Sequence, residues 1–262
     1  MRKTAVIALA LCLVFATVLA SGCQALGILV GSGKTVTQDF TLADFTRIAA
    51  GWTFDVTVSQ GAAFSVSVTV DDNLQTYLDV AKNGDTLDIS MKSGYSYTST
   101  HLKAVVTMPS LKGLTLSGAS KGSVSGFSST DDFTLGVSGA SQASFTSTAV
   151  GKLTFDISGA SRASGAINAS GDAVLKVTGA SSIDLSGQAG NLNLQVSGAS
   201  TADLTGFAVH DASFNISGAS NATVTASGTL SGDISGASRL YYTGTPTLGS
   251  INTSGASSVN KK

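Results

Sequence analysis

The tetrapeptide Ser117-Gly118-Ala119-Ser120 decides the fold, because it recurs seven more times at a nearly constant spacing. Successive copies begin 18 to 21 residues apart, and one copy opens with Thr178 in place of serine. Self-similarity at a fixed period in this range marks a repeat architecture, in which each unit stacks on its neighbours. The eight copies occupy residues 117–120, 138–141, 158–161, 178–181, 197–200, 217–220, 235–238 and 254–257.

The residues on both sides of each copy alternate in polarity. Before the third copy, Phe155 and Ile157 are apolar and Asp156 between them is charged, and most other copies share this pattern. A second alternating run follows the tetrapeptide, as in Ile183 and Leu185. Period-2 alternation is typical of a half-buried strand. Each repeat is therefore predicted to contain a strand, a corner, a second strand and a return segment, which together stack as a parallel β-solenoid.

The glycine of each copy is expected to serve the corner rather than a ligand. A sharp bend favours a positive φ, which glycine adopts without the Cβ penalty. The final serine, such as Ser200, can satisfy backbone groups at the bend, but alternation does not say whether it faces the core or solvent. The structural corner glycines predicted in this way are Gly118, Gly139, Gly159, Gly179, Gly198, Gly218, Gly236 and Gly255.

Composition favours an all-β chain without a nucleic-acid partner. All 16 acidic residues are aspartate, and good helix formers such as Glu, Lys and Arg are absent or scarce. The formal net charge is −1, and removal of Arg2 and Lys3 would leave the chain more acidic. Nucleic-acid binding calls for a concentrated basic face, which this balance does not supply.

Residues 1–22 have the pattern of a bacterial lipoprotein signal peptide. Met1-Arg2-Lys3 precedes an apolar run, and Ala20-Ser21-Gly22-Cys23 resembles the lipobox, whose cysteine is acylated with diacylglycerol. We therefore expect lipidation of Cys23, a tether over residues 23–38, and an extracytoplasmic location on the bacterial cell membrane or outer membrane. An ordinary cleaved signal or a short membrane anchor is the alternative. Because Cys12 lies in the signal, the mature chain would hold no free thiol, which excludes disulfides and Cys-ligated metals.

Residues 39–262 are predicted to form one domain, with a β-rich N-terminal capping part over 39–112 and the solenoid over 113–262. Alternation predicts strands around Phe54–Val58 and Phe64–Val70, joined by a turn at Gln60-Gly61-Ala62. Asn83-Gly84 between alternating runs predicts a hairpin. Asp71-Asp72-Asn73 is expected to cap a short helical turn, and it lacks the spacing of a calcium loop.

The order of these features resembles the bacterial family of putative auto-transporter adhesins, head GIN domain. The resemblance rests on the strands over Phe45–Val58, on Asp71-Asp72-Asn73-Leu74, on Met108-Pro109-Ser110-Leu111 and on the repeats from Ser117. It implies a right-handed parallel β-helix in a secreted or lipid-anchored cell-envelope protein. It also implies that catalytic residues are lacking, and that adhesion is the expected role.

Few residues suggest catalysis. Asp184 and Asp203 occupy the same column of adjacent repeats, and this pair alone would suit a carbohydrate-active enzyme of the β-helix type, either a polysaccharide lyase or a hydrolase. His210 lies next to Asp211 and His101 follows a Tyr-containing loop, but neither has the context of a nucleophile. The aromatic residues expected to be exposed are Tyr95, Tyr97 and Tyr241, whereas Tyr242 is expected to fill the core or close the solenoid.

These observations favour a non-catalytic binding, adhesion or structural module of the cell envelope, without metal or cofactor. Its expected partners are the membrane, through the lipid, and a surface glycan or an envelope protein. A carbohydrate-active enzyme that uses Asp184 and Asp203 remains an alternative, as does an accessory protein of envelope stress or sensing. Lys261-Lys262 at the end of the repeat is expected to discourage edge-to-edge stacking of solenoids.

Overall fold

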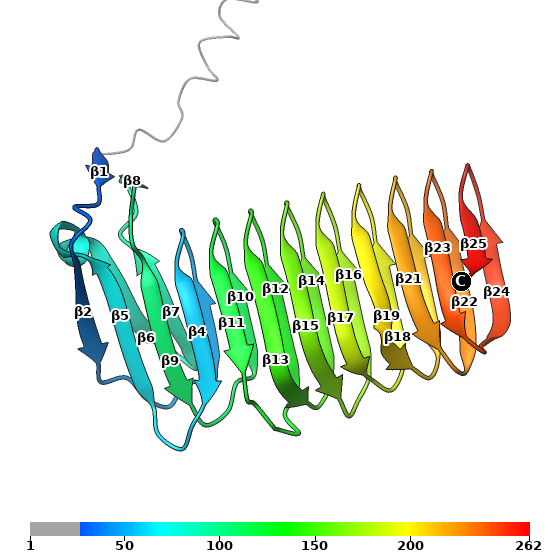
Figure 1. The fold of residues 1–262 in the computed structure, drawn as a ribbon, viewed down its shortest axis with the longest axis horizontal. Coiled ribbons are helices and arrows are strands. Elements are labelled where there is room, and N and C mark those ends of the chain that lie inside the picture. Colours follow the sequence, from blue (N-terminus) through cyan, green and yellow to red (C-terminus); the bar gives the residue numbers. More distant parts are fainter. Residues whose placement is uncertain (1–26) are drawn as a thin grey trace, which may run out of the picture.

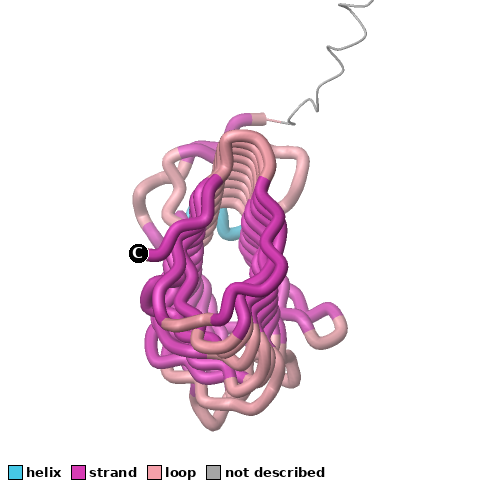
Figure 2. Tube along the Cα trace, turned by 90° about the vertical axis from the view of Figure 1, so that its right-hand side faces the viewer, coloured by secondary structure: helices cyan, strands magenta, loops and turns pink. Residues whose placement is uncertain are grey.

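The computed structural model describes residues 27–262, so the predicted signal peptide and Cys23 lie outside the described part of the chain. The described chain is an elongated solenoid, in which two long sheets face each other and the coils follow one another along one axis (Figure 1). Viewed along this axis, the corners fall in line at one edge (Figure 2). The predicted all-β architecture of stacked parallel coils is confirmed.

Each coil of the repeat contributes one strand to each sheet. In one coil, β14 (Leu153–Ile157) leads through its corner to β15 (Arg162–Ala169). The parallel register places Phe155 beside Leu135 and Leu175 of the neighbouring coils. The repeat strands of the first sheet are β10 (Gly113–Leu116), β12 (Phe133–Val137), β14, β16 (Ala173–Val177), β18 (Leu192–Val196), β20 (Ala212–Ile216), β22 (Thr229–Ile234) and β24 (Thr247–Thr253). Those of the second sheet are β11 (Lys121–Ser125), β13 (Gln142–Val150), β15, β17 (Ser182–Gln188), β19 (Thr201–Val209), β21 (Asn221–Ala226), β23 (Arg239–Gly244) and β25 (Ser258–Lys261).

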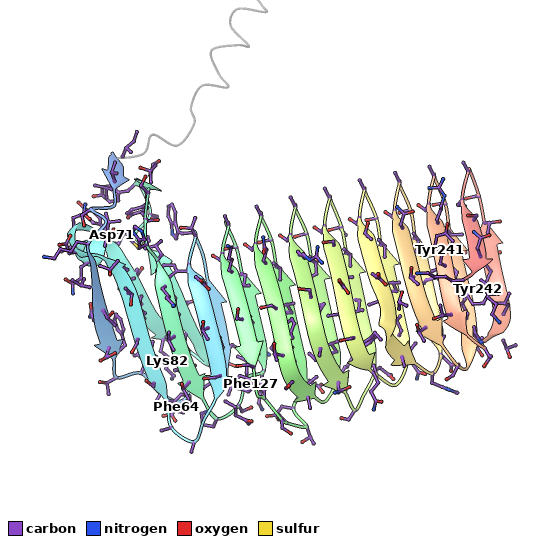
Figure 3. All side chains as sticks on the ribbon, viewed as in Figure 1. Phe64, Asp71, Lys82, Phe127, Tyr241 and Tyr242 are labelled. Atoms are coloured by element: carbon purple, nitrogen blue, oxygen red, sulfur yellow. The ribbon has the colours of Figure 1, made fainter. Side chains whose placement is uncertain are left out.

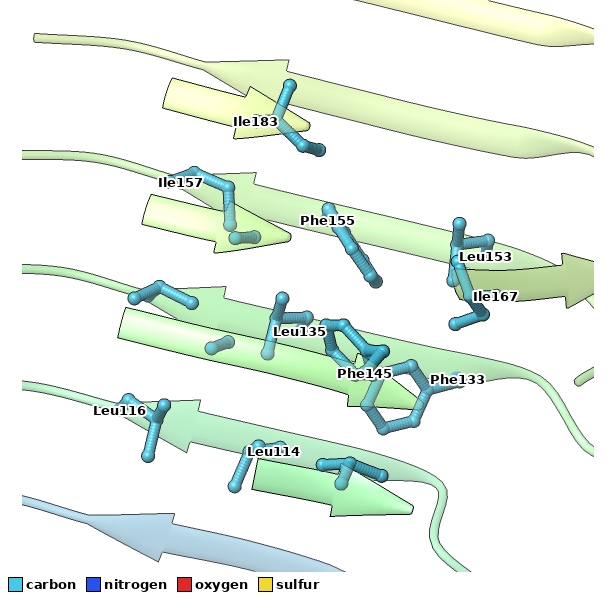
Figure 4. Close-up of a cluster of buried hydrophobic side chains, with 14 of the residues drawn as sticks. Leu114, Leu116, Phe133, Leu135, Phe145, Leu153, Phe155, Ile157, Ile167 and Ile183 are labelled. Carbon is cyan, nitrogen blue, oxygen red and sulfur yellow. The ribbon is translucent and has the colours of Figure 1, made fainter. Parts of the chain in front are cut away.

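The core is one continuous cluster of apolar side chains between the two sheets. Every other residue of β14 is buried, as the alternation predicts. The rings of Phe133, Phe145 and Phe155 contact one another, with centroids 5.4 to 6.2 Å apart (Figure 4). The column of large apolar residues along the axis therefore packs coil against coil.

Each corner approaches the corner before it so closely that no side chain fits. The eight corner glycines have φ between +70° and +82°. The amide of Ala180 donates to the carbonyl oxygen of Gly159 at 2.8 Å, and a Cβ added to Gly179 would lie 2.5 Å from that same oxygen. The backbone conformation and the close contact both require glycine here.

The last serine of the first seven corners faces the core, whereas Ser257 of the final corner is half-buried. Ser200 is 1 % exposed, and its hydroxyl donates to the carbonyl oxygen of Gly179 at 3.3 Å. The amide of Ser181 donates in turn to Oγ of Ser200 at 3.4 Å. The other buried corner serines are Ser120, Ser141, Ser161, Ser181, Ser220 and Ser238. They form an internal ladder, which can supply backbone groups at the bend with partners that water cannot reach.

Two further coils come from the segment that precedes the repeat. β3 (Arg47–Ala50) and β4 (Asp55–Gln60) pair in parallel with β10 and β11. β7 (Thr86–Met91) and β9 (Lys103–Met108) pair in parallel with β3 and β4 in their turn. The parallel stack therefore extends into the N-terminal part of the chain, because strands pair through their backbones and do not need the corner tetrapeptide.

The predicted turn at Gln60-Gly61-Ala62 does join two strands, but these strands do not pair with each other. β4 and β5 (Ser65–Asp71) belong to the same sheet, but β9 lies between them. β9 runs parallel to β4 and antiparallel to β5, and β2 (Thr35–Phe40) pairs antiparallel with the other edge of β5. Strands that follow one another in sequence are spatial neighbours only about two-thirds of the time. Alternation located these strands correctly but carried no information about the partner.

The predicted hairpin at Asn83-Gly84 is confirmed. β6 (Leu78–Asn83) and β7 pair antiparallel around it, and Gly84 has φ of +61°. β6 closes the N-terminal edge of the first sheet, and β2 closes that of the second. Antiparallel strands therefore cap one end of an otherwise parallel stack.

Part of the segment expected to be a tether forms strands. β1 (Ile28–Val30) pairs in parallel with β8 (Ser96–Thr98), beside the cap (Figure 1). The side chains of Ile28 and Val30 are 72 % and 54 % exposed. A strand of three residues has no period to detect, so the sequence does not predict it.

Asp71 does not cap the short helix that follows it. The helix η1 (Asp72–Tyr77) is a 3₁₀ helix, and the Asp71 side chain makes no capping hydrogen bond. The Asp71 carboxylate is instead fully buried at the capped end, and it accepts hydrogen bonds from the amides of Gly33 and His101 at 2.8 and 2.7 Å (Figure 3). The His101 ring lies 3.2 Å away. Asp71 thus ties three segments of the cap together.

Removal of the Asp71 charge is expected to weaken the cap and to change its response to acid. Burial alone would raise the pKa of Asp71, but the hydrogen bonds from His101 and Gly33 outweigh it and hold the pKa below the ordinary value of 3.8. The stabilisation is therefore complete above that value and is lost as the pH falls through the lower pKa of the folded state. Asp71→Asn should lower the unfolding free energy at pH 7 by about 1–3 kcal/mol.

Urea unfolding at pH 7 and at pH 3 measures this effect. The Asp71→Asn variant should lose less stability between the two pH values than the unchanged chain does. Asp233→Asn, at an exposed aspartate of the repeat, serves as the control and should behave as the unchanged chain. If the Asp71→Asn variant and the unchanged chain lose the same free energy of unfolding between pH 7 and pH 3, groups other than Asp71 cause the acid sensitivity and the prediction is wrong.

Candidate functional site

The structure brings Asp184 and Asp203 together on adjacent coils, as the repeat predicts. Each carboxylate is already engaged by its own neighbours. Asp184 lies 3.4 Å from the guanidinium of Arg162, and Asp203 accepts hydrogen bonds from the amide and hydroxyl of Thr205 at 3.0 and 2.6 Å. The hydrogen bonds from Thr205 lower the pKa of Asp203. A general acid needs the opposite shift, so Asp203 is poorly suited to protonate a leaving group.

A groove of about 310 Å³ lies over Asp203 but not over Asp184. Lys262 and Tyr241 also line it, and Tyr241 lies near the end of the solenoid opposite the cap (Figure 3). Tyr241 is 37 % exposed, whereas Tyr242 packs against the core. The two tyrosines therefore lie as predicted, and the groove does not combine both carboxylates into one site.

The two histidines lie in separate surroundings. His101 lies against the buried Asp71. Nδ1 of His210 is 3.4 Å from Oγ of Ser227, but its Nε2 is 4.0 Å from the carboxylate of Asp211, which is too long for a hydrogen bond. The His210 and Asp211 side chains are 70 % and 50 % exposed.

Tyr95 and Tyr97 belong to an aromatic cluster at the capped end and are half-buried rather than freely exposed. The ring of Tyr97 meets that of Trp52 edge-on, with centroids 5.1 Å apart, and Tyr77 lies 4.9 Å from Tyr95. Burial raises the pKa of Tyr97. The cluster packs the loop before β9 against the first corner of the solenoid.

A second groove, which we call the cap groove, lies where the β6–β7 hairpin meets the first coils. It has a volume of about 610 Å³, roughly twice that of the groove over Asp203. Its polar walls come from Asp79 and Asn83 of β6 and from Asp88 and Ser90 of β7. Trp52, in the corner formed by residues 51–54, also lines the groove.

Small side chains leave space around Asp88. Asp88 of β7 is paired with Ala81 of β6 on one side and with Ala49 of β3 on the other. Ala49 is paired in turn with Thr115 of β10. Asn83 donates a hydrogen bond to Asp88 at 2.6 Å. Neither Asp79 nor Asp88 forms an ion pair within residues 27–262. The cap groove therefore presents two uncompensated carboxylates.

Trp52 occupies the place that glycine holds in every later corner. The register of β3 with β10 and of β4 with β11 aligns Trp52 with Gly118, and Trp52 has φ of +62°. Its indole N–H donates to the carbonyl oxygen of Met91 at 3.1 Å. Sequence reasoning missed this corner because Gly51-Trp52-Thr53-Phe54 lacks the tetrapeptide, although the alternating runs on both sides could have revealed it.

In the part of the chain that the structure describes, His, Cys, Asp and Glu side chains do not gather in groups of three or more, as a metal ion would need. None of the helices found among residues 27–262 has the length and apolar character to span a membrane. The described chain is a parallel β-solenoid that carries the cap groove at its capped end.

The chain belongs to the family described as putative auto-transporter adhesin, head GIN domain, which matches residues 44–246. This confirms the resemblance inferred from the sequence. No curated protein matches the chain.

Several solved structures share the fold. A putative adhesin from Parabacteroides merdae is 20 % identical with a TM-score of 0.82, over 90 % of this chain and 99 % of that one. A putative adhesin from Parabacteroides distasonis is 20 % identical with a TM-score of 0.81, over 90 % and 100 % of the two chains. A putative lipid binding protein from the same species is 22 % identical with a TM-score of 0.79, over 90 % and 99 %. At these identities the likeness establishes the fold alone.

Proposed function

We propose that the chain is a non-catalytic binding module of the bacterial cell envelope, held to a membrane by a lipid on Cys23. The observation that carries the proposal is the match to the adhesin-like family over residues 44–246, which implies a surface or extracytoplasmic protein. Its partners would be a surface glycan or an envelope protein, in addition to the membrane.

The state of the acidic residues supports a role in binding rather than in catalysis. Asp184 and Asp156 are paired with Arg162 and Lys176, at 3.4 and 3.1 Å. Hydrogen bonds from Thr205 lower the pKa of Asp203. A glycosidase needs one carboxyl group with a raised pKa that faces a second carboxylate across the substrate.

The position of the first strand supports anchoring at the capped end. β1 begins at Ile28, five residues after Cys23. Five residues span at most about 17 Å when fully extended. A lipid on Cys23 would therefore hold the cap close to the bilayer, where the exposed side chains of Ile28 and Val30 suit an apolar surface.

Replacement of the lipidated cysteine should release the protein from the membrane. In bacteria, Cys23→Ser is expected to move the chain from the membrane fraction to the soluble extracytoplasmic fraction and to abolish incorporation of labelled fatty acid. Cys12→Ser, which changes the other cysteine of the chain, is the matched control and should leave both properties unchanged. A Cys23→Ser chain that stays in the membrane fraction would show that another segment anchors it.

An array of envelope polymers, which includes both glycans and envelope proteins, tests the binding role. The mature chain with Cys23→Ser should bind at least one polymer saturably and leave it chemically intact. Shortening or modification of a bound glycan would instead support the carbohydrate-active enzyme, whereas failure to bind any polymer would overturn the binding role.

A further inference from the structure

We propose that the cap groove binds an oligosaccharide segment that is rich in hydroxyl or amino donors and carries no negative charge. The proposal rests on the proposed binding function, and it assigns that function a site and a class of ligand. Its central residues are Trp52, Asp79 and Asp88.

The shape of the cap groove suits an extended ligand. Its volume of about 610 Å³ falls within the range of about 300–1,000 Å³ that is usual for ligand sites. Ala81, Asp88, Ala49 and Thr115 lie side by side on four neighbouring strands, and the two alanine side chains project little from the sheet. The groove is therefore open along the sheet surface.

The charge of the cap groove selects the class of ligand. Carboxylates only accept hydrogen bonds when ionised, and no lysine, arginine or histidine lines the groove. On the same sheet surface, by contrast, Asp156 is compensated by Lys176 at 3.1 Å. Asp79 and Asp88 would repel a uronate or phosphate polymer, but they can accept hydrogen bonds from hydroxyl and ammonium groups.

Trp52 adds the apolar contact that sugar recognition needs. An aromatic ring can pack against the C–H face of a sugar, while nearby carboxylates bind its hydroxyl groups. Trp52 holds a left-handed backbone conformation, which is unfavourable for a bulky residue. The hydrogen bond to Met91 and the contact with Tyr97 fix the ring at the groove.

The cap groove also lies at the anchored end of the molecule. Trp52 contacts Tyr97 of β8, and β8 pairs with β1, which begins five residues after Cys23. A ligand in this position would lie near the membrane that carries the protein. Polysaccharide of the cell's own envelope is therefore better placed to bind than a receptor on another cell.

Tryptophan fluorescence tests the proposal at the site itself, because Trp52 is the single tryptophan of the chain. The mature chain with Cys23→Ser is titrated with a glucosamine tetramer, an N-acetylglucosamine tetramer and a galacturonate tetramer. A saturable change is expected with the first two sugars and not with the third. Saturable binding of the anionic sugar alone, or no change with any of the three, would overturn the proposal.

Groove variants link the binding to these residues. Asp79→Asn and Asp88→Asn should each weaken binding of the glucosamine tetramer roughly tenfold, because a hydrogen bond to a charged group is lost. Asp233→Asn, an exposed aspartate of the same sheet far from the groove, should bind unchanged. Trp52→Gly gives this corner the glycine that every later corner has, so the variant should fold. Calorimetry should show that it does not bind the sugar.

The two proposals can fail separately. Polymer binding on the array that all three groove variants retain would overturn the cap groove as the site and leave the binding role intact. Absence of binding on the array would overturn both.

Discussion

Alanine at Gly179 is expected to lower the free energy of unfolding by about 3 kcal/mol or more. Two effects add in this variant. The residue has φ of +81°, which costs a non-glycine residue about 1–2 kcal/mol. The new Cβ would also lie 2.5 Å from the carbonyl oxygen of Gly159, so that two adjacent corners would have to move apart. The hydrogen bond from Ala180 to that oxygen would be disturbed as well.

Two other glycines separate these effects in urea unfolding. Gly126 has φ of +76°, but a Cβ there would meet nothing within 4 Å, so Gly126→Ala should cost only the conformational part. A Cβ on Gly136 would meet Thr115 at an ordinary 3.7 Å with no positive φ, so Gly136→Ala should be neutral or slightly stabilising. If Gly179→Ala costs no more than Gly126→Ala, the close approach of the corners is not what requires glycine.

Deletion of one whole coil should leave a folded protein, whereas deletion of half a coil should not. Removal of residues 182–200 joins Ser181 to Thr201, which takes the same place in the next coil. β15 would then pair with β19, and β16 with β20, with apolar residues still facing inward. Solenoid stability is approximately a sum over coils and their interfaces, so the shorter chain should unfold cooperatively at a slightly lower urea concentration.

Removal of residues 182–191 makes the contrasting variant. Ser181 would lead directly into Leu192, and the second sheet would lose one strand that the first sheet keeps. Every later corner would then fall on the edge of the solenoid opposite the earlier corners, and the later strands would not be in register with the earlier ones. Circular dichroism and urea unfolding should therefore show no cooperative transition. A half-coil deletion that folds as well as the whole-coil deletion would contradict the parallel stacking.

The repeat made most of the fold predictable. Alternation around Asp156 placed Phe155 and Ile157 in the core, and the period gave the stacking of coils. These features depend on local polarity and chain length, which the sequence displays directly. The adjacency of Asp184 and Asp203 followed from the same register.

The contacts between distant segments could not be predicted in this way. The insertion of β9 between β4 and β5 depends on pairing energies that alternation does not encode. The burial of Ser200 depends on the direction of the chain at a bend, where the period of two is interrupted. Asp71 is followed by Asp72 and Asn73, which favour a cap, yet its carboxylate is bound by Gly33 and His101 from remote parts of the chain.

The candidate site was hidden for a related reason. The cap groove forms from residues 49–52, 79–90 and 115–118, which only the non-sequential order of the first coils brings together. Trp52 stands at a corner that lacks the repeated tetrapeptide. The regular Ser-Gly-Ala-Ser corners therefore have a structural role. We expect ligand binding at the capped end, where the corner that contains Trp52 lacks this tetrapeptide.

The claim that the corners are structural and that the cap groove binds the ligand is tested most directly by comparing two proteins. These are the full mature chain and the chain without residues 182–200, and the quantity compared is their sugar binding. Trp52 is present in both, so its fluorescence reports the dissociation constant of the glucosamine tetramer in each. Recognition in the cap groove predicts the same dissociation constant and one sugar bound per chain in both proteins. A stoichiometry or affinity that falls as the corners decrease from eight to seven would place recognition on the Ser-Gly-Ala-Ser ladder instead.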